Sequence, residues 1–175
     1  MTDITATSTA EDVAARVSEA LTAAGITAVL SGGGAVQIYS GGLYVSRDLD
    51  FVSPATLREI EAALAPLGFR RSEGRHFIHA ECPFTLEFPP WPLAVGRELI
   101  RDWSHRPTAH GVIQMLTPTQ CAMDRLAAFY FWKDRQGLDQ AVAVAQAHRV
   151  DREVIRRWSE REGHTKECEE FLRRI

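Results

Sequence analysis

The sequence places two aspartates, Asp48 and Asp50, one residue apart in the run Asp-Leu-Asp-Phe. Residues two apart on a β-strand point to the same face, so the two carboxylates are expected side by side, with Leu49 and Phe51 facing the core. Such carboxylates repel each other unless a cation lies between them, and Mg²⁺ is typically held by one or two carboxylates together with substrate phosphates. The pattern favours a metal site; the alternative is an exposed strand end with two solvated aspartates.

Three consecutive glycines, Gly32, Gly33 and Gly34, follow Ser31 and the apolar segment 26–30. A strand that leads through glycines into a helix presents bare backbone N–H groups at the helix N-terminus. These groups and the helix dipole both favour anions, so the segment is a candidate phosphate site. The alternative is a tight turn that needs a positive φ angle.

A third carboxylate, Glu87, alternates with Leu86 and Phe88 in a segment typical of a strand with one buried face. If this strand lies next to the strand of Asp48 and Asp50, Glu87 points into the same cleft. Three carboxylates beside a glycine turn describe a site for metal-assisted nucleotidyl transfer, in which two metal ions clamp the attacking and leaving oxygens and the third carboxylate activates a hydroxyl. The alternative is an exposed glutamate on an edge strand.

Helices and strands alternate over the first two thirds of the sequence and must position these residues. The helical pattern begins with a capping box, Ser8-x-x-Glu11, and is expected to end at Gly25. Further elements are predicted at 26–32 (strand), 35–40 (helix), 43–52 (strand), 54–68 (helix), 69–80 (hairpin turning at 73–74), 84–88 (strand) and 111–116 (strand). Residues 91–110 give no clear prediction.

The last third of the sequence is helical. Pro118 opens a strongly periodic helix, and residues 136–175 predict two or three more helices with breaks at Gly137 and Gly163. The expected fold class is α+β, a small mixed β-sheet with flanking helices followed by a C-terminal helical part. The expected division is a disordered N-terminus (1–8), an α/β core (9–117) and a helical subdomain packed on it (118–175).

The composition is that of one globular domain: 175 residues, 45% apolar and 25% charged. The net charge of −3 arises in the acidic first thirty residues, so no basic field for non-specific nucleic-acid binding is expected. Neither a signal peptide nor a membrane span is expected. The widely spaced Cys82, Cys121 and Cys168 indicate reduced thiols of a cytoplasmic protein without a cysteine metal framework.

The run from Leu30 to Val52, LSGGGAVQIYSGGLYVSRDLDFV, resembles the signature of the nucleotidyltransferase fold of the DNA polymerase β type. That signature is a strand, a glycine pair and a helix, then a strand with Asp-x-Asp and a third acidic residue on a later strand. Within the superfamily the chain is most similar to the prokaryotic branch of AbiEii-type toxins. The motifs that carry this similarity are Gly33-Gly34-Ala35, Asp48-Leu49-Asp50-Phe51 and Arg125-Leu126-Ala127-Ala128.

The resemblance implies roles for particular residues. Asp48, Asp50 and Glu87 would be the catalytic and metal-binding residues, with Mg²⁺ or Mn²⁺ as cofactor. The nucleotide-binding residues would be Ser31, Gly32, Gly33, Gly34, Ser46, Arg125 and Lys133. Arg125 and Lys133 fall where the family often places cations that contact the triphosphate; ordinary solvated charges are the alternative. Arg70, Arg71 and Arg75 are alternative phosphate contacts.

The function implied is transfer of a nucleoside monophosphate from a nucleoside triphosphate to a hydroxyl of an acceptor. RNA, a protein side chain and a small molecule all remain open as acceptors. The AbiEii resemblance favours a toxin-like role, with an antitoxin or another protein as partner. The alternative is a binding module that keeps the fold with a degenerate metal site.

Overall fold

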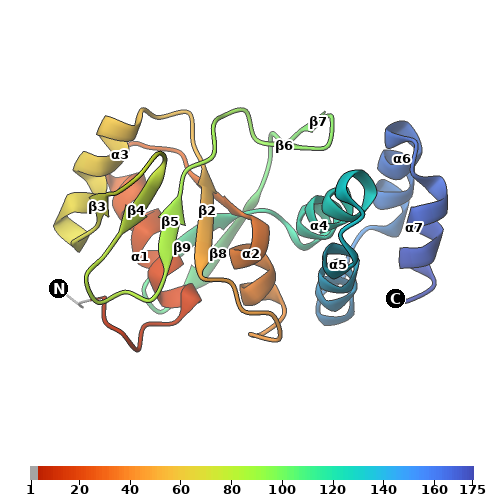
Figure 1. Cartoon of the computed structure of the whole chain (residues 1–175), viewed down its shortest axis with the longest axis horizontal. Coiled ribbons are helices and arrows are strands. Elements are labelled where there is room, and N and C mark those ends of the chain that lie inside the picture. The colour runs from red at the N-terminus through yellow and green to blue at the C-terminus, as the bar shows by residue number, and fades with distance from the viewer. Residues whose placement is uncertain (1–3) are drawn as a thin grey trace.

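The computed structural model describes residues 4–175, and its centre is a seven-stranded mixed sheet of order β3-β4-β5-β2-β1-β9-β8 (Figure 1). The strands are β1 (Val29–Ser31), β2 (Asp48–Val52), β3 (Arg70–Arg71), β4 (His76–Ile78), β5 (Thr85–Glu87), β8 (Ser104–Thr108) and β9 (Gly111–Met115). A separate hairpin joins β6 (Ala94–Val95) to β7 (Glu98–Leu99). The predicted class is confirmed: helices flank the sheet and a helical part follows it.

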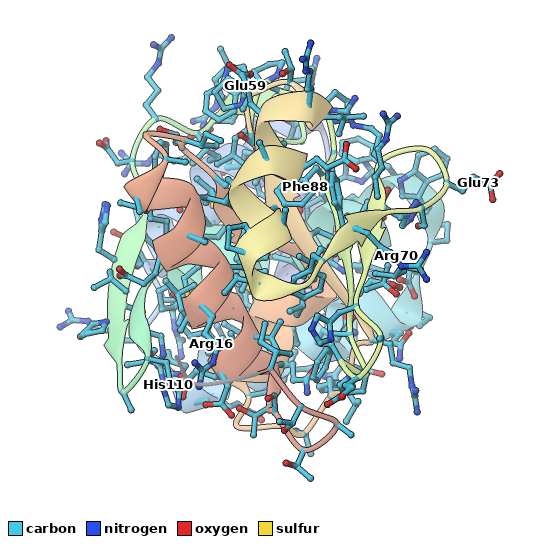
Figure 2. All side chains as sticks on the ribbon, turned by 90° about the vertical axis from the view of Figure 1, so that its left-hand side faces the viewer. Arg16, Glu59, Arg70, Glu73, Phe88 and His110 are labelled. Carbon is cyan, nitrogen blue, oxygen red and sulfur yellow. The ribbon has the colours of Figure 1, made fainter. Side chains whose placement is uncertain are left out.

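The helices are α1 (Ala10–Ala23), α2 (Gly32–Tyr39), α3 (Leu57–Leu64), α4 (Pro118–Trp132), α5 (Arg135–Ala147), α6 (Arg152–Glu162) and α7 (Thr165–Leu172), with a short 3₁₀ turn at Ala65–Leu67. Helices α1 and α3 lie side by side on one face of the sheet (Figure 2), and α4 to α7 form the C-terminal part (Figure 1). Within residues 4–175, no helix is long and apolar enough to cross a membrane.

The register of the central strands fixes which side chains share a face. Strand β2 pairs antiparallel with β1 and parallel with β5, so that Asp50 lies beside Ser31 on one side and Glu87 on the other. Leu49 and Leu86 are fully buried in the core. Because side chains alternate along a strand, the acidic residues lie on the opposite face from these leucines.

The first helix begins one residue later than the sequence pattern indicates. Thr9 is the N-cap and forms a capping box with Asp12, whereas Ser8 and Glu11 were expected. The hydroxyl of Ser8 instead accepts a hydrogen bond from the Thr5 backbone N–H, and Glu11 pairs with Arg106 on β8. Two overlapping Ser/Thr-x-x-acid patterns stand here, and the structure uses the second, with Ser8 engaged in a local turn and Glu11 engaged by Arg106.

The expected disorder of residues 1–8 falls in part on residues 1–3, which lie outside the described residues. Over residues 4–8 the chain instead forms a turn, and Ile4 is buried in the core with 4% of its surface exposed. The boundary expected at 117/118 stays a prediction. The helical part beyond it packs on the core, since α4 and α5 both contact α2.

Two helix boundaries differ from the sequence prediction. Helix α3 begins at Leu57 and not at Pro54, because Thr56 and Glu59 form its capping box. Gly137 lies inside α5 and is not a break. A Cβ at Gly137 would lie 2.7 Å from the Arg125 carbonyl oxygen, so glycine allows α5 to approach α4 closely. Gly163 ends α6, as predicted, and adopts the left-handed conformation.

Candidate functional site

A cavity of about 260 Å³ lies where the carboxylate face of the sheet meets α4. Its polar lining comes from three places in the sequence: Ser31 and Gly32 at the start of α2, Asp50 on β2, and the pair Asp124 and Arg125 on α4. The remaining lining is Val52, Pro89, Pro90, Pro92, Leu93 and Ala94. The structure thus brings Ser31, Gly32, Asp50 and Arg125, all predicted site residues, to one cavity.

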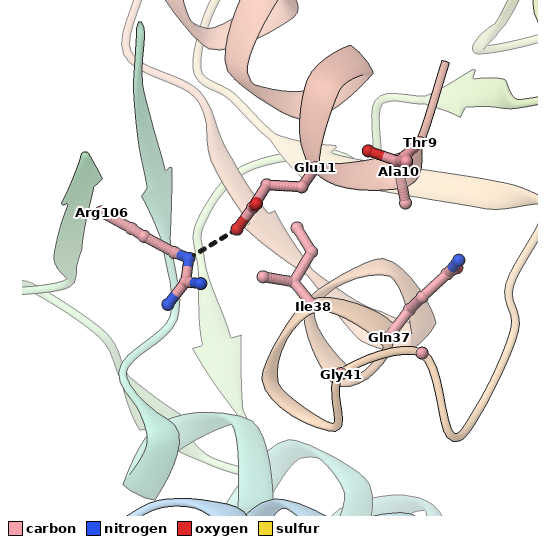
Figure 3. A pocket seen from close by; sticks show the side chains of 8 residues that line it. Thr9, Ala10, Glu11, Gln37, Ile38, Gly41 and Arg106 are labelled. Carbon is pink, nitrogen blue, oxygen red and sulfur yellow. Dashed lines mark hydrogen bonds and ion pairs between the residues drawn. The ribbon is translucent and has the colours of Figure 1, made fainter. Parts of the chain in front are cut away.

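A larger cavity of about 410 Å³ lies elsewhere, between the start of α1, α2 and β8 (Figure 3). Its two charged lining residues, Glu11 and Arg106, pair with each other at 2.9 Å. Their charges are therefore mutually satisfied. The candidate site is the smaller cavity, where the predicted residues meet.

The glycine run is itself the first turn of α2, where the sequence predicted a loop ahead of the helix. Gly32 has φ = +61°, and a Cβ there would lie 2.3 Å from Asp50 Oδ2. Only glycine therefore lets the Asp50 carboxylate lie directly against the start of this helix. The N-cap, Ser31, makes no side-chain capping hydrogen bond, which leaves the first-turn N–H groups available to an anion.

The next two glycines provide close packing for the strand of the aspartates. A Cβ at Gly33 would lie 2.9 Å from Ser46 Oγ, and one at Gly34 would lie 2.8 Å from Leu49 Cδ2. The Ser46 hydroxyl donates to the Asp48 carbonyl at 2.8 Å, and the Ser46 backbone N–H donates to the Gln37 side chain at 2.9 Å. Ser46 therefore ties the entry of β2 to α2; its predicted contact with nucleotide stays a prediction.

Like charges crowd the Asp50 carboxyl group. Burial raises its pKa to about 6, and the charges of Glu87 and Asp48 contribute to the same shift, while Arg125 opposes it. Asp48 is exposed at the start of the strand, and Glu87 is partly exposed. Asp48 and Glu87 are therefore each close enough to Asp50 for their charges to act on its carboxylate.

This donor set fits a hard divalent cation. A cation beside Asp50 would relieve the repulsion, and carboxylate oxygens are the ligands that Mg²⁺ prefers. Within residues 4–175, no three His, Cys, Asp or Glu side chains form a ready-made metal cage. Mg²⁺ needs no such cage, because it usually keeps several waters and takes oxygens from substrate phosphates.

Arg125 is mostly buried and is bound to its neighbour in sequence. Its guanidinium donates to Asp124 Oδ2 through Nη2 at 2.6 Å and through Nε at 3.0 Å. Burial acts to lower the pKa of Arg125, but the charge and hydrogen bond of Asp124, together with Cys121 and Asp50, outweigh burial and the pKa is raised. Sequence analysis missed Asp124, although its place directly before Arg125 was visible.

The other predicted cations lie differently. Lys133 follows the last residue of α4 in a left-handed conformation, is exposed, and pairs with Glu167 on α7 at 3.5 Å. Its role in nucleotide binding stays a prediction.

In the β3–β4 hairpin, Arg71 donates to the Gly74 carbonyl and Arg75 to the Phe88 carbonyl. Arg70 projects outward from this hairpin (Figure 2).

Glu87 has a neighbour that sequence analysis did not assign to the site. His76 on β4 lies opposite Glu87 in the sheet, and its Nε2 is 3.5 Å from Glu87 Oε2. The antiparallel register of β4 and β5, which brings His76 to Glu87, depends on tertiary structure.

No family of known proteins matches the chain by sequence, and no curated protein matches it. Two solved structures match its fold. The crystal structure of ANT(2'')-Ia in complex with adenylyl-2''-tobramycin has a TM-score of 0.50 at 16% identity, over 91% of this chain and 94% of that one. The solution structure of the antibiotic-resistance factor ANT(2'')-Ia has a TM-score of 0.49 at 17% identity, over 89% and 95%.

The crystal-structure match gives the class of the fold. The chain is similar over nearly its whole length to a nucleotidyltransferase, as the sequence resemblance implied, and the protein has a nucleotidyltransferase-type fold. At 16% identity the likeness concerns the fold alone. Membership of the AbiEii-type branch stays a prediction.

Proposed function

We propose that this protein is a Mg²⁺-dependent nucleotidyltransferase that moves a nucleoside monophosphate from a nucleoside triphosphate to a hydroxyl of an acceptor. The observation that carries the proposal is the position of Asp50. Its carboxylate lies against the start of α2 and lines the cavity, where burial and the charges of Glu87 and Asp48 raise its pKa. N–H groups that can bind phosphate and a carboxylate that can bind a metal ion thus lie next to each other.

Asp48 and Asp50, with Glu87 completing the set, would hold Mg²⁺ or Mn²⁺, which supplies positive charge for the phosphates and the leaving pyrophosphate. The first-turn N–H groups of α2 bind phosphate oxygens beside Gly32 and Gly33. Arg125 offers further positive charge across the cavity. As the acceptor oxygen bonds to the α-phosphorus and the bond to pyrophosphate breaks, a Glu87 carboxylate oxygen takes the proton of the acceptor hydroxyl.

For the acceptor, a small hydroxyl-bearing molecule is our first choice. The crystallised fold neighbour is bound to adenylyl-2''-tobramycin, and this chain covers 94% of its length. A compact chain with a small cavity suits a small acceptor, and the absence of an overall basic charge gives no support to RNA. The alternative is a toxin-like role in the cytoplasm, in which the protein modifies RNA or protein and has an antitoxin partner. Transfer of label to RNA or protein in a panel of acceptors would support this alternative.

The second candidate is a non-catalytic binding module. The observation that favours it is the ion pair between Arg125 and Asp124. In this pair Asp124 already neutralises the cation that is expected to bind the triphosphate. Catalysis requires this pair to open or to share its guanidinium with a phosphate. A binding module would hold nucleotide without transferring it.

The test is a transfer assay with each radiolabelled nucleoside triphosphate, Mg²⁺, and tobramycin, bulk tRNA or protein as acceptor. Label is expected on the small acceptor, and substitution of both aspartates by asparagine is expected to abolish it. Asp102→Asn, at an exposed position ahead of β8, is the matched control. Nucleotide binding measured by calorimetry without transfer to any acceptor would favour the binding module.

A further inference from the structure

The segment that forms one wall of the candidate cavity is fastened to the C-terminal helices. Pro92, Leu93 and Ala94 line the cavity, and the chain continues into the β6–β7 hairpin before it returns to the sheet at β8. In Figure 1 the hairpin lies above α4 and points from the sheet toward α6. The wall is thus held at both ends, by the sheet where it begins and by α6 at the hairpin.

Glu162, the last residue of α6, is the centre of this attachment. Its side chain is only 3% exposed, yet it carries a carboxylate. Oε1 accepts the backbone N–H of Arg97 at 2.9 Å, and Oε2 accepts Arg97 Nε at 3.2 Å. A buried carboxylate is costly unless it is paired, so α6 depends on the hairpin tip as much as the tip depends on α6.

Neighbouring contacts support the same attachment. The Arg97 guanidinium also donates to the Arg161 carbonyl at 2.7 Å, and Arg161 pairs with Glu98. The fully buried Trp158 donates its indole N–H to the Val95 carbonyl at 3.2 Å. Both strands of the hairpin and its turn are therefore bound to one side of α6.

The turn of the hairpin is shaped for this carboxylate. Gly96 has φ = +58°, a conformation that favours glycine. A Cβ at Gly96 would lie 2.9 Å from both Cδ and Oε1 of Glu162. The glycine is thus required by the backbone conformation and by the closeness of the carboxylate.

We infer that Glu162 is a positioning residue: by binding the hairpin tip, it holds the wall formed by residues 92–94 across from Asp50 and Arg125, and so sets how tightly the cavity binds its substrate. The kinetic part of this inference rests on the proposed function. The structural part, that α6 controls the wall, does not. In this arrangement the C-terminal helices act on the cavity at two points, through Arg125 on α4 and through the hairpin.

Amide hydrogen exchange of the substrate-free protein tests the structural part. Glu162→Ala removes both acceptors, and the amides of residues 93–98 are expected to exchange at least tenfold faster. Glu162→Gln keeps the shape of the side chain and one acceptor, and a threefold increase in the exchange rate is expected. If Glu162→Ala does not fold, the result for Glu162→Gln decides the test. Glu160→Ala, exposed on the same helix, is expected to exchange as the wild type does. Unchanged exchange at 93–95 in the folded Glu162 variants would overturn the inference.

Steady-state kinetics with ATP, Mg²⁺ and the acceptor found by the transfer assay test the consequence. Glu162→Gln is expected to raise the KM for ATP or for the acceptor at least threefold, with kcat within twofold of the wild-type value. Glu160→Ala is expected to change neither KM nor kcat. Equal KM values in Glu162→Gln and wild type would refute the positioning role. If wild-type protein transfers no nucleotide, the proposed function fails, and the exchange experiment still decides whether α6 holds the wall.

Discussion

The candidate site has two halves that are built differently. The carboxylate half lies on three neighbouring strands, where the register sets Asp50 beside both Ser31 and Glu87. The helical half consists of Arg125, Asp124 and the wall at residues 92–94, and it depends on how α4 and α6 pack. In the first half, strand alternation sets the face of each carboxylate and strand pairing brings the carboxylates together, whereas the second half depends on helix packing. The carboxylate half is therefore expected to govern chemistry, and the helical half to govern affinity.

The largest effect is expected from Asp50→Asn. Loss of the central carboxylate is expected to lower the transfer rate at least about 10³-fold, or about 4 kcal/mol, because metal-stabilised charge in the transition state is lost. The fold is expected to persist, since the substitution removes a repelling charge. The assay is transfer of label from ATP, with Asp102→Asn as control. Retained transfer in Asp50→Asn would place the chemistry elsewhere.

A pH dependence of stability is expected from the same carboxylate. The pKa of Asp50 is raised to about 6 from 3.8, so its ionised form is less favourable in the folded protein than in the unfolded chain. The free energy of unfolding contributed by Asp50 is therefore expected to rise as the pH falls from about 6 toward 4, by up to about 3 kcal/mol. Urea unfolding in EDTA at several pH values measures this rise.

The control for that experiment is Asp50→Asn, in which the rise is expected to shrink because the titrating group is gone. Mg²⁺ at pH 7 is expected to raise the melting temperature of the wild type and to have little effect on the variant. An equal pH dependence in both proteins would show that other groups cause it.

On the helical half, Gly137→Ala is expected to weaken the packing of α4 on α5. Alanine in a helix ordinarily stabilises by up to about 1 kcal/mol relative to glycine, and Gly137 lies in the first turn of α5. Here the added Cβ would lie 2.7 Å from the Arg125 carbonyl oxygen and 3.2 Å from the Ala128 Cβ, so a loss of about 2 kcal/mol is expected. Urea unfolding gives the sign, with the exposed Gln136→Ala as control. A gain in stability would mean that α4 and α5 can move apart to accept the added methyl group without loss of packing energy.

The same division explains what the sequence could predict. The alternation around Asp48 and Asp50, together with the apolar neighbours of Glu87, was sufficient to predict that the three carboxylates share one face of the sheet. The structure places the strands β2 and β5 side by side. Periodicity likewise predicted α4. These inferences use spacing along the chain, which secondary structure preserves.

The missed features depend on pairings between distant segments. Ser8-x-x-Glu11 and Thr9-x-x-Asp12 are equivalent capping patterns in the sequence, and in the structure Glu11 is paired with Arg106 on a distant strand. The approach of His76 to Glu87 follows from the β4–β5 register, and the packing role of Gly137 follows from the path of α4. The attachment of Glu162 to Arg97 joins residues 65 positions apart.

The smallest effect is expected from a comparison of the two cations of α4. Arg125 lines the cavity, whereas Lys133 lies at the end of the helix, exposed and paired with Glu167. Arg125→Ala is therefore expected to weaken ATP binding about tenfold, or about 1.4 kcal/mol, and Lys133→Ala less than twofold. Calorimetry with ATP and Mg²⁺ measures both.

Arg125→Ala also leaves the mostly buried Asp124 without its partner, and the unpaired Asp124 carboxylate by itself repels phosphate. The double variant Arg125→Ala/Asp124→Ala separates the two causes, because it removes both charges. If the guanidinium binds phosphate, affinity in the double variant stays well below that of the wild type. Recovery of wild-type affinity in the double variant would mean that Arg125 serves only to neutralise Asp124, and the helical half would then contribute shape to the cavity without contributing charge.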